Sequence, residues 1–163
     1  MANTNKGRKF YISTTAADGA TPEAQALTLN QAAYEALDWT QVKNIGAIGE
    51  MGTSENIVNY DELETDVIQK SKGLANAGDP TIEVARNPND NGQIAMRAAA
   101  LTKLNYAFKM EDPDVPSGGT TPTIYYNTGM VTGPSRPNGR AEDFIIEVFT
   151  LALNRRELVV APT

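Results

Sequence analysis

Three carboxylates at alternate positions form the strongest chemical pattern in this sequence of 163 residues. Glu62, Glu64 and Asp66 alternate with uncharged residues, which predicts a strand over residues 62–69 with its acidic side chains on one face. A carboxylate pair can hydrolyse a glycosidic bond, but the sequence shows no aromatic platform for a sugar. The remaining interpretations are a solvated outer face and a charged surface with a function.

The sequence contains no histidine and no cysteine. Triads built on histidine, imidazole proton shuttles and ordinary zinc, haem or iron–sulfur sites are therefore excluded. Chemistry based on carboxylates, lysine or tyrosine remains, and such sites normally carry a motif that this sequence lacks. We therefore expect a protein that is not an enzyme, with no catalytic, cofactor-binding or metal-ligating residues.

Glycines occur at every third position in Gly46, Gly49 and Gly52. The spacing differs from the dinucleotide fingerprint, which needs G-x-G-x-x-G at the start of a helix. It also echoes the nucleic-acid clamp of KH domains, but the flanking helices and positive charge of that clamp are missing. These glycines predict turns or bulges between two strands.

The segment 87–92 has asparagines and a glycine at calcium-loop spacing. However, its first position is not Asp, and Ala98 stands where a bidentate Glu is required. Asp90 as N-cap with Gln93 three residues later explains the segment better, because this pair opens a helix. The helix is predicted over residues 93–101 with Ile94, Ala98 and Leu101 on its apolar face.

The net charge is −6, from 20 acidic and 14 basic side chains. Basic residues are scattered, with small clusters at Lys6, Arg8 and Lys9 and at Arg155 and Arg156. A protein that grips nucleic acid needs a basic face, so this composition argues against such binding. No stretch approaches the ~20 apolar residues of a membrane span, and the polar start is unlike a secretory signal.

Alternating hydrophobicity predicts about eight short strands, without the alternation of strands and helices that marks a parallel sheet. The expected strands cover residues 8–14, 40–45, 55–60, 62–69, 81–86, 103–110, 123–131, 143–154 and 157–160. Helix starts are also expected at Thr21-Pro22 and at a capping box of Thr28 and Gln31. The predicted fold class is mainly β with one flanking α-helix, as an antiparallel β-sandwich or barrel.

The domain prediction is a mobile N-terminal arm over residues 1–7 and a single domain over residues 8–163. Long loops are expected at about 46–79 and 111–122. The strand over residues 143–154 carries apolar side chains on both faces, with Phe144, Ile146 and Val148 on one of them. Both faces need a cover, so a second layer or a neighbouring subunit is expected there.

Five features occur in an order that resembles the major tail protein, or tail tube protein, of long-tailed bacteriophages. They are Trp39 leading into Val42, Ile45-Gly46, Gly49 and Gly52; Tyr60-Asp61; the acidic segment up to Lys72-Gly73; Asp90-x-Gly92-Gln93; and Tyr106-x-Phe108-Lys109. The resemblance covers about residues 8–160. An appended C-terminal immunoglobulin-like domain, present in some relatives, is absent from this sequence.

The resemblance implies a virion structural protein made and assembled in the bacterial host cytoplasm. Homohexameric rings would stack into the tail tube, with neighbouring subunits completing a shared β-barrel around the channel for genome delivery. The expected partners are other copies of the chain and tail proteins such as the tape measure and tail terminator, and DNA would pass without specific binding. The alternatives are a tube component of a related contractile secretion system and a monomeric β-sandwich binding module.

Two sets of residues acquire expected roles from this resemblance. Glu62, Glu64 and Asp66 would contribute an acidic stripe to the lumen, where like charge keeps DNA from sticking. Contacts between rings are expected from the N-terminal region and the glycine-rich segment. The residues assigned to these contacts are Arg8, Lys9, Gly46, Gly49, Gly52, Lys72 and Gly73.

Overall fold

The computed structural model describes residues 3–14 and 30–163. This part of the chain forms ten strands and two helices. The strands are β1 (Lys9–Ser13), β2 (Trp39–Val42), β3 (Ile45–Ile48), β4 (Ser54–Tyr60), β5 (Gln69–Asn76), β6 (Thr81–Ala85), β7 (Tyr106–Glu111), β8 (Ile124–Ser135), β9 (Ile146–Leu153) and β10 (Leu158–Val160). The helices are α2 (Gln31–Glu35) and α3 (Asn91–Ala100). The helix start expected at Thr21-Pro22 lies outside the described residues.

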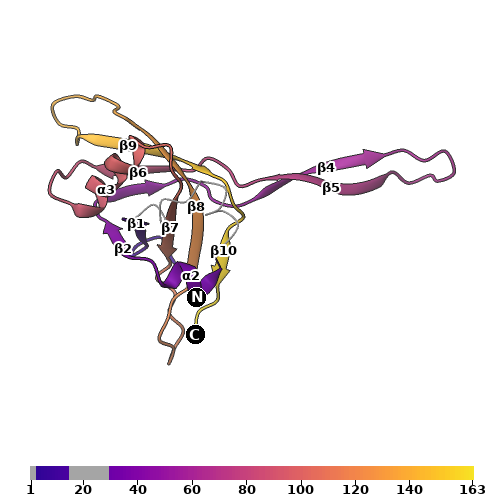
Figure 1. Cartoon of the computed structure of the whole chain (residues 1–163), viewed down its shortest axis with the longest axis horizontal. Coiled ribbons are helices and arrows are strands. Elements are labelled where there is room, and N and C mark those ends of the chain that lie inside the picture. Colours follow the sequence, from indigo (N-terminus) through magenta and orange to yellow (C-terminus); the bar gives the residue numbers. More distant parts are fainter. Residues whose placement is uncertain (1–2, 15–29) are drawn as a thin grey trace.

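Eight of the strands form one antiparallel sheet in the order β2-β1-β7-β8-β9-β6-β3, with β10 paired to the first part of β8. The sheet curls around a single core, to which strands from both of its ends contribute (Figure 1). Side chains at alternate positions of these strands fill the core, including Phe10, Ile12, Ile82, Val84, Phe108, Phe149 and Leu151. The predicted antiparallel β fold with a flanking helix is confirmed.

The curled sheet brings its two end strands, β2 and β3, toward each other, and we call the gap between them the seam. The start of α3 closes this seam. β2 and β3 are consecutive, but they do not pair with each other. Asp90 caps α3 by accepting from the backbone N–H groups of Gln93 at 3.0 Å and Lys43 at 3.1 Å. The buried Gln93 amide donates to the carbonyls of Lys43 and Ala85, at 3.0 and 2.9 Å, so it bridges the seam. The predicted N-cap is confirmed.

The apolar face predicted for α3 is wrong. Met96 and Ala99 are buried, whereas Ile94 and Leu101 are exposed. The reason is the buried position of Gln93, whose hydrogen bonds fix the rotation of the helix about its axis. Its neighbour Ile94 is then turned toward solvent.

α2 packs on β7 and β8 in a second, smaller apolar cluster of Tyr34, Ala107 and Tyr126. The rings of Tyr34 and Tyr126 stack with centroids 4.8 Å apart, and the Tyr34 hydroxyl is 2.6 Å from that of Thr128. Ala107 of β7 is buried in this cluster, on the face of the strand opposite Phe108 and Met110. The N-cap of α2 is Asn30, whose side chain accepts a hydrogen bond from the Ala33 backbone N–H. The N-cap predicted for this helix, Thr28, lies outside the described residues.

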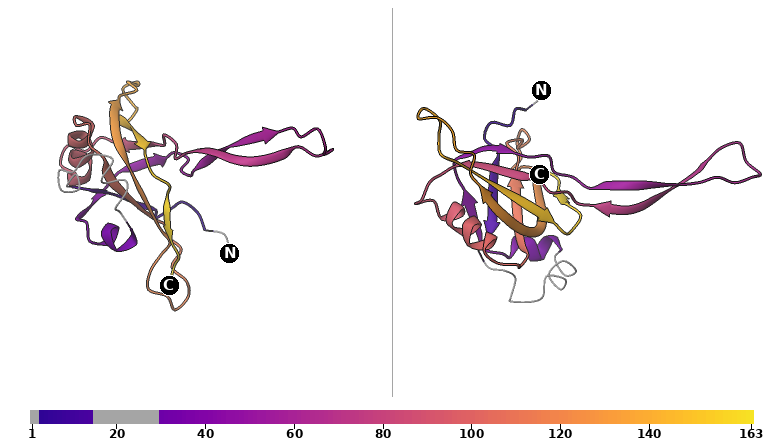
Figure 2. Two further views of the ribbon diagram at one scale, coloured as in Figure 1. Left: turned by 45° about the vertical axis from the view of Figure 1, so that its right-hand side comes forward. Right: turned by 90° about the horizontal axis from the view of Figure 1, so that it is seen from above.

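The strand predicted over residues 62–69 is wrong, because residues 61–68 form a loop. β4 turns through this loop into β5, which falls within the long loop expected at about 46–79. The resulting hairpin projects far from the body of the protein (Figures 1 and 2). An acidic loop is favoured over an acidic strand here, since solvent separates and screens the like charges.

Replacing Gly92 with alanine should destabilise the body of the protein. An added Cβ would lie 2.1 Å from the Gln41 carbonyl oxygen and 2.5 Å from the Val42 Cα, both backbone atoms that cannot rotate away. Overpacking of this kind costs roughly 1–3 kcal/mol. Chemical denaturation should show that loss for Gly92→Ala and almost none for Gly46→Ala, whose new Cβ meets only the Glu83 carboxylate at 3.4 Å. Equal stability of the two variants would contradict the tight seam.

Candidate functional site

The long hairpin (residues 53–77) is a separate two-stranded sheet, and no third strand of the described residues pairs with it. Every residue of β5 is exposed, and so are all but one of β4. Seven of the thirteen exposed large apolar side chains among the described residues belong to it: Ile57, Val58, Tyr60, Leu63, Val67, Ile68 and Leu74. Two strands without a third strand or a helix are at best marginally stable in water. The hairpin therefore needs a surface to pack on.

Strand pairing gives the long hairpin two different faces. Residues that lie directly opposite share a face, and faces alternate along each strand. One face carries Ile57, Asn59, Lys70 and Lys72, and the other carries Val58, Tyr60, Gln69 and Ser71. One face is therefore basic, whereas the other is uncharged and includes an aromatic ring. Both faces hold apolar side chains, so each could bury apolar area against a partner.

The base of the long hairpin is held by one carboxylate. Glu55 forms ion pairs with Lys72, at 3.1 Å on the returning strand, and with Arg156, which follows β9. Hydrogen bonds from Lys72 and then Arg156 hold the pKa of the Glu55 carboxyl below its ordinary value of 4.5. The charge pairs therefore tie the hairpin both to itself and to the body.

The tip of the long hairpin is acidic. Residues 61–68 contain Asp61, Glu62, Glu64 and Asp66 and no basic side chain, and all eight residues are exposed. The structure thus gathers the three predicted carboxylates in one loop, without the period-two stripe expected of a strand. That they line a channel stays a prediction.

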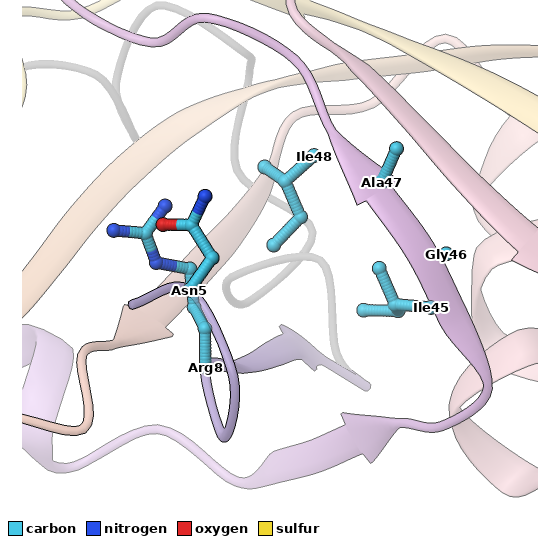
Figure 3. A pocket seen from close by; sticks show the side chains of 6 residues that line it. All are labelled: Asn5, Arg8, Ile45, Gly46, Ala47 and Ile48. Atoms are coloured by element: carbon cyan, nitrogen blue, oxygen red, sulfur yellow. The ribbon is translucent and has the colours of Figure 1, made fainter. Parts of the chain in front are cut away.

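A cleft lies beside β3, between that strand and the N-terminal segment. The cleft has a volume of about 260 Å³, and Asn5 and Arg8 face Ile45, Gly46 and Ile48 across it (Figure 3). β3 stands at the end of the strand order, so one of its edges has no strand partner among the described residues. Unpaired sheet edges accept additional strands or segments. The cleft is therefore a second place where another chain could dock.

The other residues predicted for ring contacts are more dispersed. Arg8, Gly46 and Gly49 lie together along β3, and Gly49 borders a second cavity of about 360 Å³. Lys72 and Gly73 lie on the long hairpin. The Arg8 guanidinium is bound by Asp112 at 2.6 Å, so its charge is already paired within the subunit. Gly46 lies at a β-bulge, as the glycine spacing predicts.

The strand expected over 143–154 is β9, which begins only at Ile146, and the preceding Phe144 and Ile145 are exposed. Phe149 and Leu151 of β9 are sealed in the core, and Ile146 and Val148 on the other face are half-buried. The sequence reasoning missed the apolar residues of β4 and β5, which alternate too irregularly to predict a core face. The available signal was Ile57, Val58 and Tyr60, three large apolar residues in one short strand.

The described residues contain no group of three or more histidine, cysteine, aspartate or glutamate side chains placed to hold a metal ion. None of the helices in residues 3–14 and 30–163 is both long and apolar enough to span a membrane.

The fold is shared with chains of tail-like particles. It matches a chain of the extracellular contractile injection system PVC, from the sheath/tube terminator in its extended state, with TM-score 0.68, 10% identity and coverage of 99% and 98% of the two chains. It also matches a chain from the baseplate of the anti-feeding prophage, with TM-score 0.62, 8% identity and coverage of 99% of this chain and 98% of that chain. A chain from the tube terminating cap of the anti-feeding prophage matches with TM-score 0.59, 15% identity and coverage of 74% of this chain and 82% of that chain. No family model and no curated protein sequence matches.

Acid should loosen the base of the long hairpin. Because the pKa of Glu55 is lowered in the folded protein, its ion pairs are complete above the ordinary value of 4.5 and are lost as the pH falls through the lowered value. Amide relaxation measured by NMR should therefore show increased hairpin motion at low pH. Glu55→Gln should show that motion already at pH 7, while Glu62→Gln at the tip should not. A rigid base in Glu55→Gln would contradict this role.

Deleting residues 2–7 should leave a folded subunit but impair the assembly into tubes that the sequence resemblance predicts. The deletion removes Asn5 and opens one wall of the cleft beside β3 without touching the core. Circular dichroism should show an unchanged fold, and electron microscopy should show few or no cylinders. A variant with six Gly/Ser residues in place of residues 2–7 keeps the length and tests the side chains. Normal cylinders from the deletion variant would count against the role of this segment.

Proposed function

We propose that the chain is a structural subunit of a phage tail or a tail-derived injection particle, forming hexameric rings that stack into a hollow tube. The observation that carries this proposal is the long hairpin, which exposes apolar side chains on both faces and is too thin to cover them. A subunit whose apolar surface becomes buried only on assembly is expected of a self-assembling structural protein.

The fold comparison supports the same conclusion. The three matched chains come from particles described by their tubes, caps, sheaths and baseplates. Two of them are covered almost completely by this chain, from end to end. The proposed partners are accordingly further copies of this chain and other tail components, such as the terminator and the tape measure.

The shape of the subunit favours a ring. The long hairpin extends away from the body (Figure 2), and we infer that it contacts a different surface on a neighbouring copy. Contacts between two different surfaces repeat from copy to copy, and they close into a ring when the rotation allows it. The net charge of −6 supports a conduit, because DNA in an acidic channel meets like charge and does not displace counterions.

A second candidate function is a ring that terminates a tube built from another protein. The matches to chains of a sheath/tube terminator and a tube terminating cap favour it. The two functions differ in the product of self-assembly. A tube subunit should form long cylinders of uniform diameter at high concentration, whereas a terminator should stop at single rings.

Excising the long hairpin tests the proposal. Residues 56–74 are replaced with Asn-Gly, which joins the opposed residues Glu55 and Ala75 through a two-residue turn. The variant should keep the thermal stability of the body, since the excised segment buries no side chain completely. It should remain monomeric by light scattering and form neither rings nor cylinders by negative-stain electron microscopy.

The matched control is Val115→Asp, which places a charge on an exposed apolar position of the 112–123 loop. This control should assemble like the parent chain, whereas Tyr60→Asp on the uncharged face of the long hairpin should not. Assembly of the excised variant, or a parent chain that stays monomeric at every concentration, would refute the proposal.

A further inference from the structure

Three arginines converge on one buried carboxylate at the end of the molecule remote from the long hairpin. Glu147 of β9 is completely buried, at 0% exposure. Its Oε1 atom lies 3.0 Å from Arg86 Nε and 3.0 Å from Arg97 Nη2, and its Oε2 atom lies 3.9 Å from Arg136 Nη2. We call Arg86, Arg97 and Arg136 the arginine cluster. One carboxylate cannot neutralise three guanidinium groups, so the cluster carries surplus positive charge.

Much of this surplus charge is accessible. The side chains of Arg86 and Arg136 are 47% and 57% exposed, even though both contact the buried Glu147. The adjoining loop over residues 136–145 adds Arg140, Glu142 and Asp143. The whole region then holds four arginines and three carboxylates, so its net charge is positive. A positive region is exceptional in a protein of net charge −6 and attracts carboxylates.

Apolar side chains lie directly beside the arginine cluster. Phe144 and Ile145 are 81% and 68% exposed, and the Ile145 carbonyl accepts a hydrogen bond from the Arg86 backbone N–H at 2.8 Å. A cavity of about 210 Å³ is lined by Arg136, Phe144 and Ile145 among others. The region thus combines guanidinium groups with an uncovered apolar surface.

The tip of the long hairpin has the complementary composition. Its four carboxylates stand among Leu63, Val67 and Ile68, all of them exposed. It cannot reach the arginine cluster of its own chain, because the long hairpin points away from the body, and α3 and β9, which carry Arg97 and Glu147, lie on the other side of the body (Figure 1). The length of β4 or β5 alone is about 25 Å, so the tip lies much farther from the body than the few ångströms over which an ion pair forms.

We propose that the acidic tip of one copy binds the arginine cluster and the Phe144–Ile145 surface of the next copy. The inference rests on the proposed function and specifies which two surfaces meet in the assembly. Carboxylates of the tip pair with Arg86 and Arg136, and Leu63 and its apolar neighbours cover Phe144 and Ile145. Exposed Arg side chains with apolar neighbours are typical of the residues that stabilise protein interfaces.

Other basic groups of the described chain suit the tip less well. The charge of Arg156 is taken up by Glu55, and that of Arg8 by Asp112. The loop next to Arg8 also carries Asp114, so an acidic tip would meet like charge there. Outside the long hairpin itself, the arginine cluster combines surplus charge with exposed large apolar neighbours.

Disulfide trapping tests the contact directly, because the chain has no cysteine of its own. In the double variant Glu64→Cys, Phe144→Cys, the two thiols should meet between neighbouring copies and give a ladder of covalent oligomers on oxidation. Such a bond forms only when the Cα atoms approach within about 7 Å. The control Glu64→Cys, Val115→Cys offers another exposed apolar position, on a different loop, and should give no ladder.

Charge reversal provides a second readout. The triple variant Glu62→Lys, Glu64→Lys, Asp66→Lys should keep its melting temperature, because the tip is exposed, and should raise the concentration needed for assembly about tenfold or more. Adding Arg136→Glu to that variant should restore part of the loss.

The outcomes separate this contact from the proposed function. Rings or cylinders with the Glu64–Phe144 ladder support both proposals. Rings or cylinders without that ladder, and with unimpaired assembly of the triple variant, overturn the contact and leave the proposed function standing. A chain that forms neither assemblies nor a ladder at any concentration overturns both.

Discussion

The long hairpin is a two-stranded ribbon with apolar side chains on both faces, and these side chains are stabilised only when another surface packs on them. Covering one large apolar side chain contributes roughly 1.5–3 kcal/mol, and the long hairpin exposes seven of them among the described residues. The body offers no cover, since the hairpin projects away from it. The favourable energy is therefore available only when another molecule packs on the hairpin, as in the assembly that we propose.

The body of the protein is closed by polar contacts between the two ends of its sheet. The curled sheet closes through polar contacts, because β2 and β3 do not pair and the buried Asp90 and Gln93 bridge the gap. Gln93 uses both amide donors and accepts from the Asn87 N–H and from Arg97, so its side-chain amide is fully hydrogen-bonded. Arg97 also contacts Glu147, so the contacts that close the seam continue into the arginine cluster.

The sequence predicted the elements whose signals are local. The alternation in β1 and the N-cap at Asp90 need no knowledge of distant partners, and both are confirmed. Two predictions failed where tertiary structure decided the outcome. Period two at residues 62–69 fitted a strand, but the partner of β4 is the less regular β5. The apolar face of α3 was wrong because the polar Gln93 is buried. The arginine cluster joins residues distant in sequence, so no spacing rule could find it.

The long hairpin is exposed in the single subunit, and we propose that it is covered in the assembly. Hydrogen exchange measured by mass spectrometry on peptides from β4 and β5 tests it most directly, with dilute and assembled protein compared in one buffer. Our account predicts rapid exchange in the dilute subunit and strong protection on assembly, with little change in the core strands β7 and β9. Rapid exchange of the hairpin in both states would contradict it.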